Sequence, residues 1–389
     1  MELTRKQEEG LKIAVERYRD KESYTCISGY AGTGKTTLVR FIISALQLYP
    51  SQVKYIAYTG KAAQVLAANG NLGATTAHKF MYHSRRNERT GKFYHILKKP
   101  WEVYPTKLIV VDEVSMFPKD MWEQLLTFRI PIIALGDPAQ LPPVLAESNG
   151  ILEHPHIFLD EVMRQAKDNE IIRLTMDIRE QKPLELFNGE DVKVVDSSEL
   201  MKEGIWLWPD QIIVAKNMTR KNVNNSMRKF LYNTDDPFPI EGDRIICLKN
   251  NWLMLNDDLD ALVNGLDGTI SNIRPDSNRF AEKVFRADFY PNLKNACPFG
   301  DVQMDELIFT KGTKSRNMVN PTYPIPKDFA PEQFDYGYAI TCHKAQGSEY
   351  GKVLVLEEFM RGDNAESHSK WLYTAATRAS NKLIIVRNY

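Results

Sequence analysis

One short segment, "ISGYAGTGKTTL" at residues 27–38, constrains the fold of this chain more than any other feature. Gly29, Gly34, Lys35 and Thr36 have the spacing G-x-x-x-x-G-K-[ST]. A β-rich run precedes the glycines and an apolar helical pattern follows them, so we expect a strand, a loop and a helix. In that arrangement the loop N–H groups and the helix N-terminus face phosphate groups. The segment therefore predicts a nucleoside-triphosphate site on a parallel α/β sheet.

The residues of this loop are expected to contact different parts of a bound nucleotide. Lys35 is expected to reach the β- and γ-phosphates, and Thr36 is expected to hold Mg²⁺. The glycines let the backbone turn where a side chain would clash. An ordinary glycine-rich turn is the alternative, but the flanking strand and helix favour the phosphate site. The predicted cofactors are ATP and Mg²⁺, and the predicted nucleotide-binding residues are Gly29, Gly32, Thr33, Gly34, Lys35, Thr36 and Thr37.

Composition narrows the classes of protein that remain. The chain has 389 residues, which suggests two to four domains, and 43% hydrophobic residues are ample for packed cores. The 50 basic and 50 acidic residues cancel, which argues against a uniformly basic nucleic-acid binder but allows a local basic groove. The four cysteines are far apart, so a zinc site is not expected. Without a long apolar run or a signal-peptide pattern, we expect a cytoplasmic protein with no membrane association.

The first 160 residues read as one α/β domain. Short apolar runs rich in β-branched residues alternate with helical patterns, as in a doubly wound sheet of parallel strands. The predicted strands are 23–28, 54–59, 107–113 and 131–137. Residues 81–106 interrupt this rhythm with a basic, aromatic segment that contains the turn dipeptide Thr90-Gly91. We expect an inserted hairpin there.

Residues 161–389 read as a second α/β domain with an insertion of its own. Strand patterns occur at 211–218, 352–358 and 382–388, with helices between them. Between residues 237 and 335 the texture changes to short strands separated by Gly, Asn and Asp turns. We expect a small inserted β-barrel, with 305–312 as one of its strands.

Acidic and amide residues follow two strands of the first domain. Asp112 and Glu113 end one strand beside the phosphate loop, where Asp112 can take Mg²⁺ and Glu113 can deprotonate an attacking water. Gln140 follows the next strand, where an amide can contact the γ-phosphate or the water. A plain loop glutamine is an equally good interpretation of Gln140.

Five segments together resemble a known family. They are "GYAGTGKTT", "VVDEVSM", "ALGDPAQLPPV", "YAITCHKAQGSEYG" and "LYTAATRA". Their order and spacing are similar to those of superfamily 1B helicases of the RecD/Dda branch, over nearly the whole chain. The resemblance implies two RecA-like P-loop motor domains with an inserted hairpin and a small SH3-like β-barrel. It also implies ATP-driven 5′-to-3′ movement on single-stranded DNA and separation of duplex or forked DNA by a monomer, in the company of replication or repair proteins.

The same resemblance implies further nucleotide contacts. Gln7 corresponds to a glutamine that recognises adenine. Arg164 and Arg378 correspond to arginines that reach the γ-phosphate from the domain junction and from the second domain. Gly347 is expected near the phosphates and Glu349 near the ribose.

Ten residues are implied to meet DNA. Phe93 and Tyr94 are expected to stack on the junction base pair, although the basic hairpin that carries them is also consistent with a solvated loop. The other implied contacts lie at strand ends of both domains and include one histidine that could equally be structural, His78. They are Thr59, Lys61, Thr76, His78, Asn217, Arg220, Thr341 and His343.

Two other functions remain open from the residues alone. A different P-loop enzyme, such as a small-molecule kinase, would need an acceptor pocket and one α/β domain, and DNA-stimulated ATPase activity would argue against it. A DNA-binding clamp or loader subunit would use ATP only as a switch. Turnover that rises with DNA length would exclude that reading.

Overall fold

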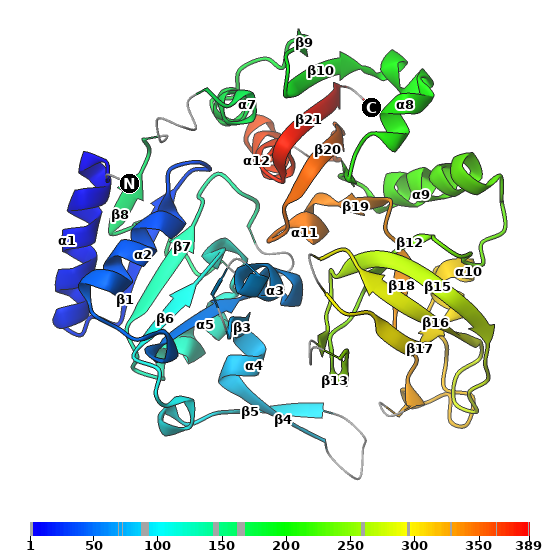
Figure 1. The fold of residues 1–389 in the computed structure, drawn as a ribbon, viewed down its shortest axis with the longest axis horizontal. Coiled ribbons are helices and arrows are strands. Elements are labelled where there is room, and N and C mark those ends of the chain that lie inside the picture. The colour runs from blue at the N-terminus through cyan, green and yellow to red at the C-terminus, as the bar shows by residue number, and fades with distance from the viewer. Residues whose placement is uncertain are drawn as a thin grey trace.

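The computed structural model describes residues 3–68, 70–71, 73–86, 93–142, 148–161, 168–257, 261–293, 296–326, 329–362, 364–387 and 389. Figure 1 shows three sheet-based parts: a first α/β unit in blue and cyan, a second in green, orange and red, and a mostly yellow antiparallel sheet beside both. The sites discussed below lie where these parts meet.

The first α/β unit is a parallel sheet with strand order β3-β2-β6-β7-β1-β8. The four predicted strands are confirmed, whereas the short β3 and β8 had no periodic pattern long enough to predict. The strands are β1 (Tyr24–Gly29), β2 (Val53–Ala57), β3 (Thr75–Thr76), β6 (Leu108–Val111), β7 (Ile132–Gly136) and β8 (Ile157–Leu159).

Helices of the first unit lie against this sheet. At the N-terminus Thr4 caps the helix α1 and exchanges backbone and side-chain hydrogen bonds with Gln7. The helices are α1 (Arg5–Arg19), α2 (Lys35–Ala45), α3 (Gly60–Ala68), α4 (Ala77–Met81) and α5 (Lys119–Leu126), with short turns η1 (Pro50–Gln52), η2 (Pro100–Val103) and η3 (Val114–Met116).

An antiparallel pair projects from the first unit at the bottom of Figure 1. It consists of β4 (Tyr82–Arg86) and β5 (Phe93–Leu97), paired from Tyr82 with Leu97 to Arg86 with Phe93. The pair lies between α4 and η2, within the segment where the sequence predicts an insertion.

The second α/β unit has the strand order β19-β11-β20-β21-β10-β9, with every pair parallel except β10 with β9. Its strands are β9 (Phe187–Asn188), β10 (Val192–Asp196), β11 (Gln211–Val214), β19 (Ala339–Thr341), β20 (Tyr350–Leu356) and β21 (Ala379–Arg387). Its helices are α7 (Glu170–Arg179), α8 (Glu203–Leu207), α9 (Asn217–Tyr232), α11 (Cys342–Ala345) and α12 (Ala365–Ala376), with η4 (Ser197–Met201).

The third part is an antiparallel sheet with strand order β17-β16-β15-β12-β18. These strands are β12 (Arg244–Cys247), β15 (Asp267–Pro275), β16 (Val284–Pro291), β17 (Phe299–Asp305) and β18 (Phe334–Tyr336). A separate pair joins β13 (Asn251–Leu255) to β14 (Ala261–Leu262).

The expected strand at 305–312 is wrong, because the segment forms the helix α10 (Glu306–Lys311). Asp305 caps this helix by accepting a hydrogen bond from the Leu307 N–H, and Gly312 ends it at φ 68°. An acidic cap and a glycine in the left-handed region are helix-end signals that outweigh the β-branched character of a six-residue run.

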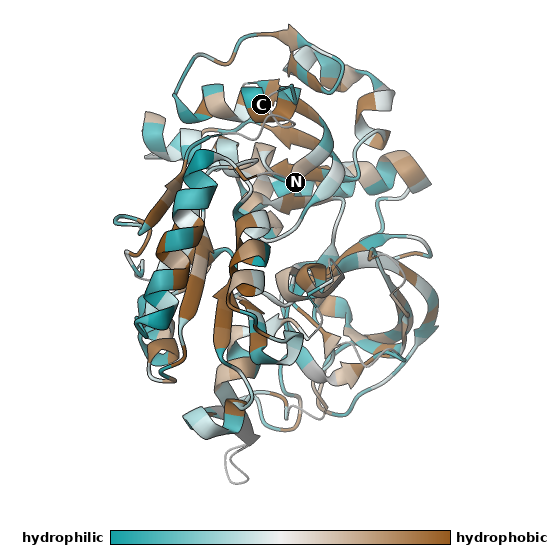
Figure 2. Cartoon of the chain, turned by 60° about the vertical axis from the view of Figure 1, so that its left-hand side comes forward, coloured by the Kyte–Doolittle hydropathy of each residue, from teal (hydrophilic) through white to brown (hydrophobic). Residues whose placement is uncertain are grey.

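Buried side chains of alternate residues serve the two faces of the first sheet. Ile109 and Val111 face the core under α5, whereas Leu108 and Val110 face the core under α2. In Figure 2 the sheet strands are accordingly brown, while α1 turns a teal face to solvent. The antiparallel sheet shares one hydrophobic core with β11 and α9. Within the portion of the chain that the structure describes, no helix has the length and apolar character to cross a membrane.

Candidate nucleotide cleft and adjoining channel

The phosphate loop joins β1 to α2 as the sequence predicts. Gly34 caps α2 at φ 77°, a left-handed conformation that side chains rarely adopt. A Cβ on Gly29 would lie 2.7 Å from the Leu159 carbonyl oxygen, so the backbone there has no room for a side chain. Lys35 Nζ donates to the carbonyl oxygens of Gly29 at 2.7 Å and Tyr30 at 3.0 Å. The ammonium group therefore points into the loop.

Gln7 is buried against this loop rather than exposed on α1. Its Nε2 donates to the Thr33 carbonyl oxygen at 3.1 Å, and its Oε1 accepts from the Thr4 N–H at 3.0 Å. Thr33 is also buried, and its hydroxyl donates to the Tyr30 carbonyl oxygen at 2.8 Å. These bonds join α1 to the phosphate loop through Gln7 and Thr33.

The acidic pair follows β6 at the edge of the same cleft. The Glu113 N–H donates to Asp112 Oδ1 at 3.0 Å, and Glu113 has a positive φ of 51°. Such a backbone costs about 1–3 kcal/mol for a non-glycine residue, and strain of this kind is concentrated at functional sites. Burial, and then the charge of Glu113, raise the pKa of the Asp112 carboxyl to about 6, although Lys35 and Arg378 oppose the shift.

These residues fit a magnesium ion. Asp112 supplies a carboxylate whose ionised form is disfavoured by burial and by its acidic neighbour, and a divalent cation would relieve both effects. Thr36 is exposed in the first turn of α2 and supplies a hydroxyl, and Thr37 beside it is half-buried. Among the described residues no group of three or more His, Cys, Asp and Glu side chains could hold a metal. A small number of protein ligands is consistent with Mg²⁺, because this ion keeps several waters and binds substrate phosphates.

Three predicted catalytic residues meet across the cleft, although they come from different parts of the chain. With its amide oriented toward complementary partners, Gln140 donates to Glu113 Oε2 at 2.8 Å and accepts from Arg378 Nη2 at 3.1 Å. Arg378 Nη1 lies 3.7 Å from Glu113 Oε1. Arg378 is buried just after α12, and it also donates to the Thr374 and Ser348 carbonyl oxygens. The second unit thus supplies a fixed cation to the acid of the first.

Two other predicted nucleotide contacts, Gly347 and Glu349, lie beside α3 and a neighbouring pocket, and their nucleotide role remains a prediction. Gly347 has φ 71°, and a Cβ on it would lie 2.7 Å from the Ala62 Cβ of α3. Glu349 is exposed and lines a different pocket, described below. Their neighbour Gln346 does reach the cleft side, where its Nε2 donates to the Leu141 carbonyl oxygen at 3.1 Å.

A cavity of about 210 Å³ lies between the two α/β units and the antiparallel sheet. It brings together three residues implied to contact DNA, Thr59, Lys61 and His343. Lys344 lines it as well, and sequence reasoning missed this residue although it adjoins His343. Burial, and then the charge of Arg220, lower the pKa of Lys344 to about 8. The full lining is Tyr58, Thr59, Lys61, Met116, Asn264, Gly265, His343, Lys344, Gln346 and Ser348.

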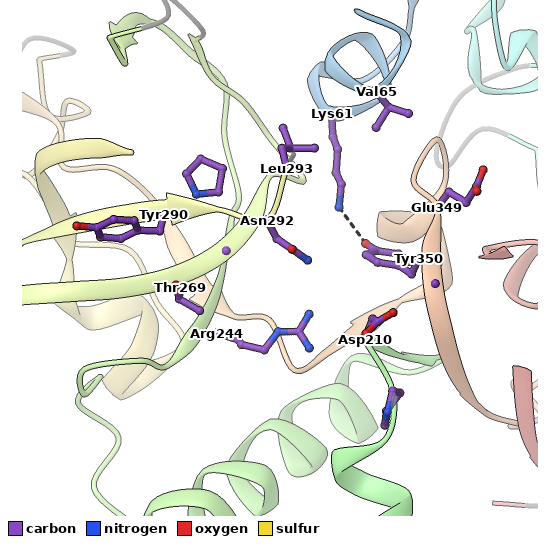
Figure 3. Close-up of a pocket in the computed structure, with 14 residues that line it drawn as sticks. Lys61, Val65, Asp210, Arg244, Thr269, Tyr290, Asn292, Leu293, Glu349 and Tyr350 are labelled. Atoms are coloured by element: carbon purple, nitrogen blue, oxygen red, sulfur yellow. Dashed lines mark hydrogen bonds between the residues drawn. The ribbon is translucent and has the colours of Figure 1, made fainter. Parts of the chain in front are cut away.

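Lys61 is held inside a three-part junction. Its ammonium pairs with the Asp267 carboxylate of β15 and donates to the Tyr350 hydroxyl of β20 at 3.1 Å. Lys61 is 5% exposed and Asp267 2% exposed. Figure 3 shows Lys61 reaching from α3 toward Tyr350, across a pocket of about 710 Å³ that Arg244 and Asn292 also line. A DNA contact by Lys61 would require this ion pair to open.

The remaining implied DNA contacts lie in varied surroundings. Thr76 is buried and caps α4 by accepting from the Lys79 N–H at 3.2 Å. His78 is half-buried beside the rings of Tyr58, Tyr82 and His95, and burial lowers its pKa.

Three more of these residues come from the second unit. Arg220 pairs with Asp335 at 2.7 Å, Thr341 is buried at the end of β19, and Asn217 is exposed at the start of α9. The side chains of Phe93 and Tyr94, and the whole of Arg164, lie outside the described residues.

Comparison with known proteins relates this geometry to a family. The profile of the AAA domain family matches residues 2–199, and that of the UvrD-like helicase C-terminal domain matches residues 336–386. The crystal structure of a Pif1 helicase from Bacteroides in complex with ADP-AlF3 and ssDNA superposes with a TM-score of 0.56 at 16% identity, covering 99% of this chain and 92% of that chain. The two proteins therefore share an α/β, RecA-like fold with parallel sheets.

Several characterised relatives are similar to this chain in sequence. The ATP-dependent DNA helicase Dda of Enterobacteria phage T4 is 25% identical over 268 residues, covering 63% of this chain and 61% of the relative. The ATP-dependent RecD2 DNA helicase of Deinococcus radiodurans is 26% identical over 377 residues, covering 92% and 46%. The chain thus spans about half to three-fifths of these two relatives. Because the first profile covers half of it, the chain belongs to the AAA domain family, and its relatives place it in the Dda/RecD/Pif1-like group of superfamily 1B helicases.

Proposed function

We propose that the protein is an ATP-dependent DNA helicase that moves 5′ to 3′ on single-stranded DNA and separates duplex DNA. The observation that carries this proposal is the contact of Arg378 from the second α/β unit with Glu113 and Gln140 beside the phosphate loop of the first. An active site that is complete only when two units meet can convert nucleotide turnover into relative movement of those units.

In this mechanism the chain's own residues position and activate a water. Lys35 leaves the loop carbonyls for the β- and γ-phosphates, and the loop N–H groups bind their oxygens. Glu113 accepts the proton of the attacking water, which Gln140 orients between the carboxylate and Arg378. Arg378, together with Arg164, stabilises charge on the transferring phosphoryl group. Mg²⁺, held through Thr36 and Asp112, would neutralise phosphate charge.

We infer that single-stranded DNA follows the cavity lined by Thr59, His343 and Lys344 at the junction of the three parts. Contacts there would be made mainly to phosphates, so binding would show little sequence preference. Asn217, Arg220, Thr76, His78 and Thr341 remain proposed contacts around this path, and Gln7, Gly347 and Glu349 remain proposed nucleotide contacts. Lys61 would join the path only after releasing Asp267.

We propose the domain boundaries and insertions that the sequence predicts. Residues 1–160 would form the first RecA-like domain with a strand-separating hairpin at 81–106, and residues 161–389 the second, with an SH3-like barrel at 237–335. The paired strands β4 and β5 and the antiparallel sheet support these two insertions. Phe93 and Tyr94, which pair with Arg86 and Arg85 at one end of the β4–β5 pair, would stack on the base pair at the junction. The buried free cysteines Cys26, Cys247 and Cys342 support a reducing, cytoplasmic setting.

Forked duplexes with a 5′ tail or a 3′ tail test the proposal. The monomeric protein should unwind the 5′-tailed duplex with ATP and Mg²⁺ and leave the 3′-tailed duplex largely intact. Preferential unwinding of the 3′-tailed substrate would refute the direction. DNA-stimulated turnover without any unwinding would instead favour an ATP-switched clamp or loader subunit, the alternative function.

A further inference from the structure

A buried tyrosine of the second unit reaches the phosphate loop of the first. Tyr373 lies in the last turn of α12 and is 1% exposed. Its hydroxyl oxygen accepts a hydrogen bond from the Ala31 N–H at 3.0 Å and donates its proton to Asp137 Oδ2 at 2.6 Å. One phenol thus joins the loop after β1 to the loop after β7, from the opposite side of the cleft.

Asp137 gives this contact its strength. The carboxylate is 2% exposed, and its second oxygen, Oδ1, accepts from the Ala139 N–H at 2.9 Å. Burial raises the pKa of Asp137, and the charge of Lys35 opposes that shift. Burial and the Asp137 charge also raise the pKa of the Tyr373 hydroxyl, so the phenol keeps its proton at physiological pH. Hydrogen bonds to a buried charged group are among the stronger ones in proteins.

The same end of α12 makes one more connection to the cleft and also holds Arg378. The Thr374 hydroxyl accepts from the Leu141 N–H at 2.9 Å, directly after Gln140. Arg378 Nε donates to the Thr374 carbonyl oxygen at 3.1 Å, which fixes the guanidinium to the helix. The phenol that holds Ala31 and the guanidinium that meets Glu113 are therefore parts of one rigid segment.

We propose that Tyr373 is a positioning residue that couples the conformation of the phosphate loop to the placement of Arg378 on Glu113 and Gln140. This inference rests on the proposed function. In this role Tyr373 acts through Arg378 rather than on the reacting groups. It acts because a displacement of the Ala31 N–H or of Asp137 is transmitted through α12 to Arg378, and the reverse holds for a movement of the second unit.

The protein contains a control in which a buried tyrosine also donates to a buried carboxylate, although that carboxylate is paired with Arg228 as well. Tyr338 is also buried, and its hydroxyl donates to the buried carboxylate of Asp243 at 2.8 Å. Asp243 precedes β12 and Tyr338 precedes β19, so this bond joins the antiparallel sheet to the second unit and lies away from the phosphate loop. Tyr373→Phe and Tyr338→Phe each remove one hydroxyl and leave one buried carboxylate short of a donor.

The experiment compares both variants for melting temperature, ATP affinity and turnover with and without single-stranded DNA. We expect both variants to have a lower melting temperature than the wild type. Tyr373→Phe alone should lower kcat about tenfold, equal to about 1.4 kcal/mol in the barrier, with KM for ATP changed far less. If Tyr373→Phe keeps kcat and DNA stimulation within about twofold of Tyr338→Phe, the bond is only structural and the proposal is overturned.

A double-mutant cycle with Arg378→Lys gives a readout that a structural role would not move. If Tyr373 acts through Arg378, the double variant should lose less turnover than the product of the two single losses. Losses that multiply would refute the coupling. Should Tyr373→Phe fail to fold, Asp137→Leu tests the same link by removing the acceptor, and the same two outcomes decide. Unwinding by the wild type decides the proposed function separately, because the cycle uses ATP turnover without DNA.

Discussion

Replacing Lys61 by methionine should destabilise the folded protein by about 3 kcal/mol. Removing one partner of a buried ion pair typically costs about 3–5 kcal/mol, because the other charge stays buried without compensation. Asp267 would keep a hydrogen bond from Asn292 Nδ2 at 3.3 Å and would face Arg244 Nη2 at 3.8 Å. Arg244 is partly exposed and can move closer, so we expect the lower end of that range.

Thermal unfolding at neutral pH measures this effect. A loss of 1 kcal/mol lowers the melting temperature by about 2–4 °C in domains of 150–250 residues, so Lys61→Met should cost several degrees. The double variant Lys61→Met/Asp267→Asn should recover most of the loss, because no buried charge remains unpaired. Lys182→Met is a matched control, since Lys182 pairs with Asp177 at 2.6 Å on the exposed surface and should leave the melting temperature essentially unchanged.

The result that would refute this reasoning is a Lys61→Met variant with the same melting temperature as the wild type. That outcome would mean that the ammonium and the carboxylate are solvated in solution and that the three parts are not joined there.

Salt-dependent binding of single-stranded DNA gives a second readout for Lys61. A slope of log affinity against log salt that falls by about 0.7 in Lys61→Met would show that the pair opens and Lys61 neutralises one phosphate.

The remaining predictions concern the cleft, the channel and the hairpin. Glu113→Gln should abolish ATP turnover while Mg·ATP still binds, as checked by equilibrium nucleotide binding; near-normal turnover would contradict the base assignment. Arg378→Ala should lower kcat by about 10³ with little change in ATP affinity, measured in steady-state kinetics. Affinity for single-stranded DNA should fall between pH 7 and pH 9 as Lys344, with a pKa of about 8, loses its proton, and Lys344→Met should flatten that profile in fluorescence anisotropy. Replacing Phe93 and Tyr94 by alanine should reduce unwinding while DNA-stimulated ATPase activity persists, because stacking on a base contributes about 1–3 kcal/mol.

Local signals in the sequence were enough to predict most of the first α/β unit. The spacing of Gly29, Gly34 and Lys35 predicted the phosphate loop, since positive φ angles and close backbone approaches admit few residues other than glycine. Apolar runs predicted the buried strands of the first sheet, and strand-end polarity predicted the positions of Asp112, Glu113 and Gln140. Each of these inferences concerns residues whose hydrogen bonds and steric limits lie within a few positions of one another.

Contacts between distant segments were decided only by the tertiary structure. Nothing near Lys61 in the sequence indicates that an aspartate of β15 would neutralise it, and nothing near Tyr373 indicates that its hydroxyl would hold the Ala31 N–H. Glu349, directly before β20, likewise lines the pocket of Figure 3 together with residues of α3 and of the antiparallel sheet. The physical reason is that a side chain's partner across an interface depends on how whole units pack. That packing is determined by all the surface that the units bury together, and local sequence spacing does not encode it. Local sequence spacing determines where the acid, the amide and the glycine loop can stand, and the packing of two α/β units against one antiparallel sheet determines which charges they meet.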